Sequence, residues 1–390
     1  MFKKSLMLTV AAVLLASVWV NDVQAIPAFA RKYKISCSTC HIAMPKLKAY
    51  GDEFAGNGFL LPDGEEPRRA YIDTGDDMLL LNSDFPIAVR LDAYAQVENR
   101  DNVNTDLGVP FGIKLMSGGP VSKKVSYYFY FYLSEGGEVA GVEDAFLYFN
   151  DIGGIPFDLT VGQFQVSDPL YKRELRLTYE DYQIFRVTPG LSKANLTYDR
   201  GLVLDYGFDF GLGATAMLIN GNGIKPAEEK IFDSDNSKSY VLRLTQEIGP
   251  VTIGGFAYSG QETLSDSANA KNNVLYIGPD INVATENWEL VLQYLHREDD
   301  NAFFNPAAPM KSKVDGGFAE FTVFPQGDQS LFIYTLLYNY IDSDISEYKY
   351  NTATVSVSHM AARNLRFMAE VTYNIETEKP RFTVGAVAAF

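Results

Sequence analysis

Two cysteines and a histidine form the motif in this chain that most clearly predicts chemistry. Cys37 and Cys40 are the two cysteines of the 390 residues, and His41 follows directly. Cys-x-x-Cys-His is the attachment pattern of haem c. Two thiols at this spacing can form thioethers with the two vinyl groups on one edge of a porphyrin, and the next imidazole supplies an axial ligand. We predict one covalent haem c on Cys37 and Cys40, with His41 as the proximal iron ligand.

The alternative for the two cysteines is a redox-active disulfide of the thioredoxin kind. The histidine after the second cysteine and the lack of a surrounding βαβ pattern disfavour it. The distal ligand stays unknown at this stage. His296 and His359 are expected to face lipid or the rim by strand parity. Met360, expected to face the lumen near a short turn, is a weak candidate, since methionine ligation is known in cytochromes c.

The N-terminus predicts export of the chain. Lys3 and Lys4 precede an apolar stretch over residues 6–20, and small residues end at Ala25. This is the pattern of a cleaved signal peptide, because the stretch is short for a spanning helix. We therefore divide the chain into a signal peptide (1–25), a monohaem cytochrome c segment (26–75) and a porin-like barrel (76–390).

The haem segment is predicted to contain one short helix over Pro45–Ala55. Proline suits the first helical position, Leu47, Tyr50 and Phe54 share one face, and Gly56 and Gly58 would end the helix. So small a segment lacks a complete core. We expect it to sit on the periplasmic side or inside the barrel as a plug. Arg31 and Lys32 could pair with haem propionates.

Beyond residue 86 the chain alternates apolar and polar residues with the period of a β-strand. Val89, Leu91 and Ala93 alternate with Arg90 and Asp92, for example. An apolar outer face and a wet inner face predict an all-β transmembrane outer-membrane barrel. A soluble β-sandwich is the alternative. About sixteen antiparallel strands are predicted, over 86–99, 109–118, 123–134, 141–150, 158–165, 201–207, 211–220, 239–248, 251–261, 273–284, 287–297, 314–324, 330–341, 349–360, 364–375 and 380–390.

Three further features agree with a barrel in the outer membrane. Short and long connections alternate along the strands, and the chain ends on an aromatic residue, Phe390, as outer-membrane barrels do. The 24 Tyr and 26 Phe suit aromatic girdles facing outer-membrane lipid.

A net charge of −16 excludes nucleic acid as a partner. The long loops carry acidic clusters that could attract cations.

Residues 26–59 resemble a known family. Pro27-Ala28-Phe29-Ala30-Arg31 precedes the Cys-x-x-Cys-His motif, and Pro45, Leu47, Tyr50-Gly51, Phe54 and Gly58-Phe59 follow it. This run is similar to the fused monohaem cytochrome–porins of iron(II)-oxidising bacteria. The resemblance implies a sixteen-strand porin that takes electrons from extracellular Fe(II), or another redox partner, and passes them to periplasmic c-type cytochromes. An Fe(II) oxidase activity would follow.

Two other functions remain open from the sequence. The chain could be a diffusion porin whose haem is structural or senses redox state. It could instead export electrons to extracellular acceptors. Ser/His/Asp triads, phosphate loops and zinc clusters are not found, and three histidines in total leave few hydrolytic sites. The competing functions therefore share the barrel and the haem and differ in what passes through them.

Overall fold

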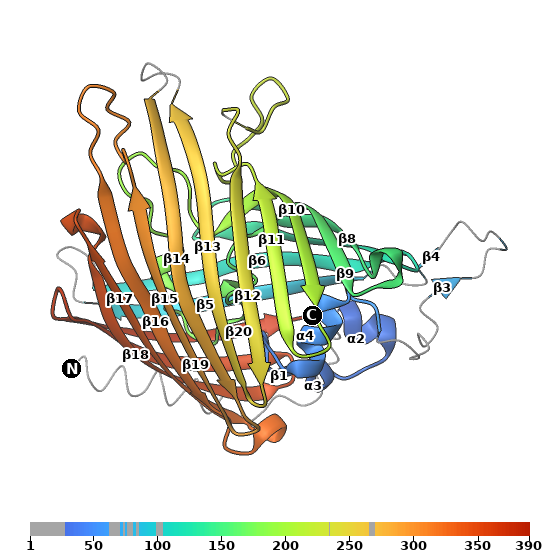
Figure 1. Cartoon of the computed structure of the whole chain (residues 1–390). Helices are drawn as coiled ribbons and strands as arrows, with labels where there is room; N and C mark the ends of the chain where they lie inside the picture. The colour runs from blue at the N-terminus through green and yellow to red at the C-terminus, as the bar shows by residue number, and fades with distance from the viewer. Residues whose placement is uncertain are drawn as a thin grey trace, which may run out of the picture.

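Sixteen strands close into a β-barrel in the computed structural model of the chain (Figure 1). The structure describes residues 28–61, 71–72, 75, 81–82, 86–98, 104–233, 235–264 and 270–390, so the predicted signal peptide lies outside the described residues. Each strand pairs antiparallel with the next, and β20 pairs with β5 to complete the ring. The strands are β5 (Ile87–Glu98), β6 (Thr105–Ser122), β7 (Val125–Glu135), β8 (Gly141–Phe149), β9 (Phe157–Gln165), β10 (Tyr198–Gly207), β11 (Leu212–Ile219), β12 (Ser239–Ile248), β13 (Val251–Leu264), β14 (Ala270–Ala284), β15 (Trp288–Asp299), β16 (Ser312–Val323), β17 (Phe332–Ser343), β18 (Tyr350–Ala362), β19 (Leu365–Asn374) and β20 (Lys379–Ala389).

The strands form because side chains alternate between an apolar outside and an enclosed lumen. Strand β17 shows the pattern without interruption: Phe332, Tyr334 and Leu336 are exposed on the outside, whereas the intervening Ile333 and Thr335 are buried inside. Full closure leaves no unpaired strand edge, which is the condition for a β-sheet in lipid. The fold confirms the predicted sixteen-strand antiparallel barrel. His296 and His359 have the outward parity expected for them, and Met360 faces inward.

Long loops and short turns lie at opposite ends of the barrel. The short-turn end includes the links 123–124, 249–250 and 363–364, and the long-loop end includes 166–197, 220–238 and 300–311. Backbone bonds between Val89 and Phe390, at 2.7 and 2.9 Å, join the last residue to the first barrel strand at the short-turn end. The helices of the described residues include none long and apolar enough to cross a membrane.

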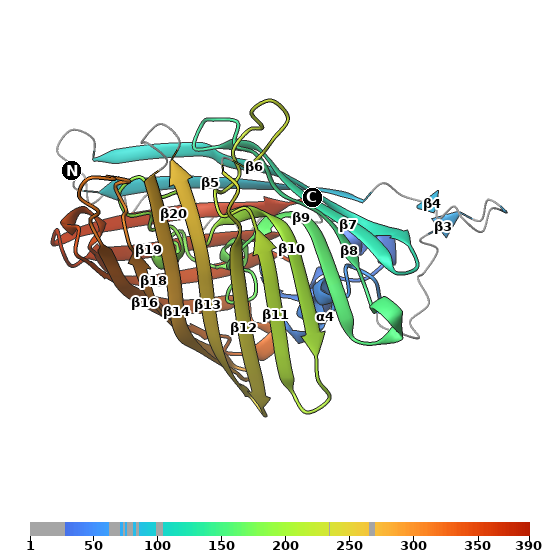
Figure 2. The same cartoon turned by 45° about the horizontal axis from the view of Figure 1, so that its top comes forward.

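The segment before the barrel folds as short helices around a small hairpin. These elements are α2 (Ala28–Tyr33), α3 (Cys37–Cys40), β1 (His41–Ala43), β2 (Lys46–Leu47) and α4 (Ala49–Gly56), followed by the two-residue strands β3 (Tyr71–Ile72) and β4 (Leu81–Asn82). Both views place the helices at one end of the barrel (Figure 1, Figure 2). The predicted short helix is present, but its predicted start at Pro45 was wrong. Residues 41–47 instead form the β1–β2 hairpin with Pro45 in its turn, and the helix begins at Ala49.

The connection between β9 and β10, residues 166–197, turns inward and fills the middle of the lumen. Its 3₁₀ turns are η3 (Arg173–Leu175) and η4 (Gln183–Phe185); further turns of this kind lie in other connections, namely η2 (Ile152–Gly154), η6 (Gly327–Gln329) and η7 (Ser346–Tyr348). Ile184 and Phe185 are fully buried against inward side chains of the barrel, such as Phe318. Because these apolar groups leave water, the loop is held inside the barrel. We call residues 166–197 the inward loop.

Candidate functional site

The two cysteines lie on one short helix at the short-turn end. Ser36 caps α3, since its Oγ accepts a hydrogen bond from the Ser38 amide at 3.3 Å. This cap satisfies an amide at the helix start and fixes where the helix begins. Cys37 and Cys40 then lie one turn apart, and their thiols are free rather than joined in a disulfide. Two free thiols one turn apart are the arrangement that attachment to a porphyrin edge requires.

His41 leaves the helix and enters the β1–β2 hairpin. Its Nδ1 lies 3.0 Å from the Pro45 carbonyl oxygen, which is supplied by the turn of the same hairpin. An imidazole that donates one ring N–H to a backbone carbonyl is oriented to coordinate through its other nitrogen. Burial lowers the pKa of His41, so the imidazole is neutral at pH 7, the form that ligates iron.

The electrostatics around the thiols differ from those of a disulfide oxidoreductase. Burial raises the pKa of Cys40 to about 11 and also raises the pKa of Cys37. Reactive CxxC motifs instead have a thiol whose pKa is lowered. In this structure both thiols are therefore protonated at neutral pH.

Helix α4 packs directly on the backbone of the motif. The Cys40 carbonyl accepts a hydrogen bond from the Lys48 amide at 3.0 Å, and Gly51 lies against the same carbonyl. A Cβ at position 51 would overlap that oxygen, so glycine is required there. Gly58, with φ of +64°, meets the side chains of Ser126 and Tyr148 of the barrel in the same way. Gly51 thus allows α4 to pack closely on the motif, and Gly58 allows the segment to pack closely on the barrel wall.

Aromatic stacking and ion pairs hold the segment inside the barrel. Phe29 stacks on Phe59, and Phe59 stacks on Tyr128 of β7, with ring centroids 4.9 Å apart in each pair. On the other side, Lys46 pairs with Glu289 at 2.6 Å. Arg31 donates to the Ile87 carbonyl of β5. The described part of the segment is therefore packed against the inner wall of the barrel.

A cavity of about 630 Å³ adjoins the motif. It lies within the size range of cofactor sites. Its walls come from the segment, from inward side chains of β5–β12, from the inward loop, from the β18–β19 turn and from the end of β20. They include Cys37, Cys40, His41, Phe29, Phe54, Phe59, Met116, Tyr128, Phe146, Asp168, Lys172, Glu174, Met217 and Arg363. The motif residues and the aromatic groups face this one space. We call it the inner cavity.

The weak candidate for the distal ligand lies outside the inner cavity. Met360 is buried in a small cluster with Ala43, Leu177, Phe324 and Ile333, and it is not among the cavity-lining residues. The methionines that do line the cavity are Met44, Met116 and Met217. Met116 and Met217 come from strands β6 and β11, so they approach from the wall rather than from the segment.

Propionate partners were also predicted at positions that the structure uses differently. Arg31 is bound to β5, and Lys32 is buried beneath the segment, where burial lowers its pKa to about 8. Instead, Arg363 and Lys172 line the inner cavity. Within the described residues, Nη1 of Arg363 is buried without a hydrogen-bond partner. Sequence reasoning missed Arg363, because nothing in the sequence of a short turn indicates that a charged residue there will line a cavity.

A second, larger cavity of about 910 Å³ lies on the other side of the inward loop. It is strongly polar: nine Lys and Arg residues and six Asp and Glu residues line it, namely Arg90, Lys114, Arg173, Arg176, Arg186, Lys193, Lys225, Arg366 and Arg381 against Asp92, Glu135, Glu143, Glu174, Glu180 and Asp181. Residues 222–225, from a long loop, contribute to its lining. We call it the outer cavity.

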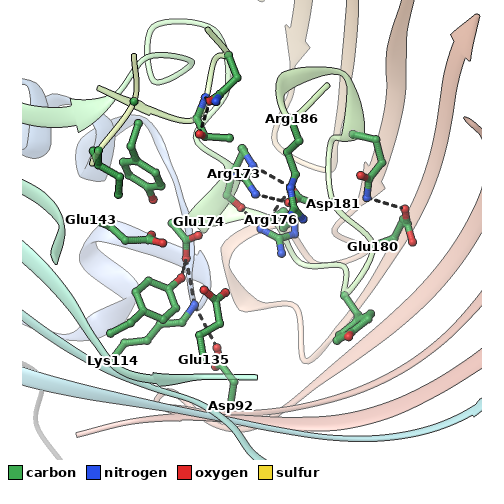
Figure 3. Close-up of a pocket in the computed structure, with 18 of the residues that line it drawn as sticks. Asp92, Lys114, Glu135, Glu143, Arg173, Glu174, Arg176, Glu180, Asp181 and Arg186 are labelled. Atoms are coloured by element: carbon green, nitrogen blue, oxygen red, sulfur yellow. Dashed lines mark hydrogen bonds and ion pairs between the residues drawn. The ribbon is translucent and has the colours of Figure 1, made fainter. Parts of the chain in front are cut away.

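Two ion-pair networks organise the outer cavity (Figure 3). In the first, Asp181 pairs with Arg173 and lies 3.6 Å from Arg176 and 3.5 Å from Arg186. Burial alone would raise the pKa of Asp181, but the guanidiniums of Arg176 and Arg173 lower it to about 2. In the second, Lys114 lies 3.1 Å from Glu174 and 3.3 Å from Asp92.

Three charged residues separate the two cavities. Arg90, Lys114 and Glu174 line both of them. Tyr132 donates a hydrogen bond to Glu174 at 2.8 Å, which ties β7 to the inward loop at this wall. The pKa of Glu174 is held well below its usual range because the cations Lys114, Arg176 and Arg90 outweigh the effect of burial. The wall between the cavities is therefore one layer of fixed charges.

Several acidic residues of the long loops form ion pairs with lysines in the described part of the chain. Asp233 pairs with Lys238, Glu298 with Lys313, and Asp342 with Lys349. No group of three or more His, Cys, Asp or Glu side chains among the described residues is placed to hold a metal ion. Some acids of the loop clusters singled out in the sequence are thus paired with neighbouring lysines.

Comparison with known proteins shows the fold of the barrel. No protein-family model matches the chain, and no curated protein matches it in sequence. Similar solved structures include the anion-selective porin from Comamonas acidovorans, with a TM-score of 0.58 and 10% identity over 79% of this chain and 99% of that one. A loop L8 deletion mutant of OmpT from Vibrio cholerae gives 0.56 and 13%, over 79% and 99%. The DcaP channel of Acinetobacter baumannii gives 0.56 and 11%, over 79% and 97%. At these identities the likeness establishes a porin-like barrel fold.

Proposed function

We propose that this chain is an outer-membrane monohaem cytochrome–porin that carries electrons across the membrane. Extracellular Fe(II) is the proposed donor, and periplasmic c-type cytochromes are the acceptors. The haem segment would then lie at the periplasmic end of the barrel, inside the short-turn rim. The single observation that carries the proposal is that a Cys-x-x-Cys-His motif with free thiols lines a cavity inside a porin-like barrel.

The residues around the inner cavity fit haem c. The cavity has the volume of a cofactor site, aromatic side chains line it, and His41 is oriented by the Pro45 carbonyl. Buried polar atoms without partners in the described chain also face it, including Arg363 Nη1, which suits a propionate. Cys37 and Cys40 would hold the group covalently, and His41 would ligate the iron. When bound, the haem would supply a one-electron redox centre.

The remaining residues serve this function by enclosing and insulating the site. The segment closes the short-turn end through its contacts with Tyr128 and Glu289. The inward loop closes the other side and leaves the charged wall of Arg90, Lys114 and Glu174 between the inner cavity and the outer cavity. A donor that enters from the long-loop end would reach this wall from the outer cavity, and the wall would separate it from the inner cavity. Such an arrangement separates electron passage from free diffusion of solutes.

Two measurements test the proposal. Pyridine haemochrome spectroscopy and intact mass on the purified outer-membrane fraction should find one haem c per chain, absent from a Cys37→Ser/Cys40→Ser variant. Anaerobic mixing of the ferric protein with Fe(II) should then reduce the haem. An unmodified chain mass, or cysteines bridged to each other, would rule out the cytochrome. A haem that Fe(II) leaves oxidised would rule out the donor.

A channel function is the second candidate, because solved structures with this fold are porins and channels. The anion-selective porin from Comamonas acidovorans is one of them. In that case the haem would be structural or sensory, and solutes would pass through the lumen. The packed segment and the inward loop argue against an open pore. Conductance in planar bilayers discriminates, since a barrel closed in this way should pass little current.

A further inference from the structure

The floor of the outer cavity contains arginines whose hydrogen-bonding capacity is not used. Arg366 of β19 is 1% exposed. Its Nη1 donates to the Leu177 carbonyl at 2.6 Å and to Ser358 Oγ at 2.8 Å, but its Nε is buried without a partner among the described residues. A buried cation with an open donor is costly unless an anion completes it.

Two neighbours share this property. The Nε atoms of Arg176 and Arg381 are also buried and lack a partner in the described chain. Arg176 does contact Asp181 at 3.6 Å, and Arg381 pairs with Glu180, so both retain one carboxylate. Arg366 has no ion pair with any described carboxylate. All three line the outer cavity, and they come from the inward loop and from two adjacent strands.

The charge of the cavity points the same way. Cations exceed carboxylates by nine to six in its lining, although the whole chain carries −16. Local positive charge inside a low-dielectric barrel concentrates anions strongly. Arginine presents a planar set of donors that matches carboxylate and phosphate groups. The cavity is roomy enough, at about 910 Å³, for a small multivalent anion.

We infer that the outer cavity is a binding site for a small multivalent oxyanion, carrying carboxylate or phosphate groups, with Arg366 and Arg176 as its principal ligands. The anion would enter past the long-loop residues at 222–225. It would lie against the wall of Arg90, Lys114 and Glu174. The site itself does not depend on haem. In one respect the inference rests on the proposed function: iron would then reach the wall as its complex with such an anion, rather than as a bare cation.

Calorimetric titration of the full-length, detergent-solubilised protein with citrate and, separately, with pyrophosphate tests the site without iron. We expect saturable binding of at least one probe that weakens with added salt. Arg366→Gln and Arg176→Gln should each raise Kd about tenfold or more, because each removes a charge-assisted bond. Lys124→Gln, which removes an exposed cation of a short turn that lines neither cavity, should leave Kd unchanged.

The outcomes distinguish a carboxylate from a phosphate ligand, and they distinguish the proposed anion site from the proposed haem function. Tighter binding of citrate identifies a carboxylate, and tighter binding of pyrophosphate identifies a phosphate compound. No binding of either probe, or equal Kd in wild type and both cavity variants, would overturn the inference. Heat-modifiable migration on gels checks that each variant has a folded barrel. Because no haem signal is read, a chain without haem could still bind the anion, and a haem protein could fail to bind it.

Discussion

Met360 provides a test of the haem site at the scale of one side chain. It packs in a cluster with Ala43, Leu177 and Phe324 rather than in the wall of the inner cavity. We therefore expect Met360→Leu, a substitution of similar volume, to leave the haem absorption spectrum and redox potential unchanged. Potentiometric titration followed by absorption makes the measurement.

The comparison variants for this prediction are Met116→Leu and Met217→Leu. Both residues line the inner cavity. Loss of an axial methionine lowers the potential of a cytochrome, so a drop in either variant identifies the distal ligand. A drop confined to Met360→Leu would instead restore Met360 as the ligand and contradict its placement behind the β1–β2 hairpin.

Arg363 is expected to stabilise a haem propionate. Its Nη1 is buried without a partner in the described chain and faces the inner cavity. A cation near the haem favours the reduced state, so Arg363→Gln should lower the potential. If the contact favours the reduced over the oxidised state by about 1 kcal/mol, the potential changes by ~40 mV for one electron. Lys311→Gln makes the same change of charge on an exposed long loop and should shift the potential little; equal shifts in both variants would contradict a propionate contact.

At the scale of elements, the barrel strands were predictable and the packing of their connections was not. Apolar and polar residues alternate along a strand such as β17 because one face contacts lipid and the other faces the lumen, so the pattern is visible within the strand itself. All sixteen predicted strands occur, with ends shifted by a few residues. The inward loop, in contrast, is held by residues far away in sequence, such as Phe318 against Tyr182 at 4.1 Å between ring centroids. Such long-range pairs leave no periodic signal.

In the segment before the barrel, too, some features could be predicted from the local sequence and others could not. The Cys-x-x-Cys-His motif on α3 can be read directly from the spacing of its residues, and its attachment to haem stays a prediction. The start of the following helix was predicted at Pro45 because proline suits a first helical turn. The structure places Pro45 in the β1–β2 turn instead, where its carbonyl oxygen contacts His41. The pairing of β1 with β2 and the contact of Pro45 with His41, visible only in three dimensions, override the local preference of the sequence.

The inward loop should be released by acid. The pKa of Asp181 is about 2 in the fold, against about 4 for a free aspartate. A carboxyl whose pKa is lowered on folding contributes stability above pH ~4, and that contribution is lost as the pH falls from ~4 to ~2. Hydrogen exchange of residues 166–197, normalised for the intrinsic pH dependence, should therefore rise across this range.

Asp181→Asn is the matched variant for the acid release. It removes the charge that Arg173, Arg176 and Arg186 surround. Exchange in the inward loop should then be faster at neutral pH, and its step between pH 4 and 2 should shrink to the part contributed by Glu174, whose pKa is also lowered in the fold. A variant that retains the full step would show that Asp181 does not control the loop. Exchange in the barrel strands, which do not contact Asp181 through these pairs, serves as the internal reference.

At the scale of the whole molecule, the segment and the inward loop divide the barrel interior into two cavities on either side of one charged wall. Barrels of sixteen strands are wide enough to leave an aqueous channel when nothing fills them. The segment fills the short-turn end through the stack of Phe59 on Tyr128 and the pair of Lys46 with Glu289. The fold of a pore is thus combined with an interior occupied by the segment and the inward loop.

Deleting residues 28–61 while keeping the signal peptide should therefore open the barrel. We expect the single-channel conductance in planar bilayers to rise several-fold over the wild type, because the short-turn end loses the group of side chains that fills it. The Cys37→Ser/Cys40→Ser variant is the control: it lacks the thiols but keeps the segment, whose contacts with Tyr128 and Glu289 do not involve them. Its conductance should stay low. If the deletion variant conducts no better than the wild type, the inward loop alone closes the barrel and the segment is not its plug. If the cysteine variant conducts as well as the deletion variant, the group attached to the cysteines occludes the lumen, and the polypeptide does not.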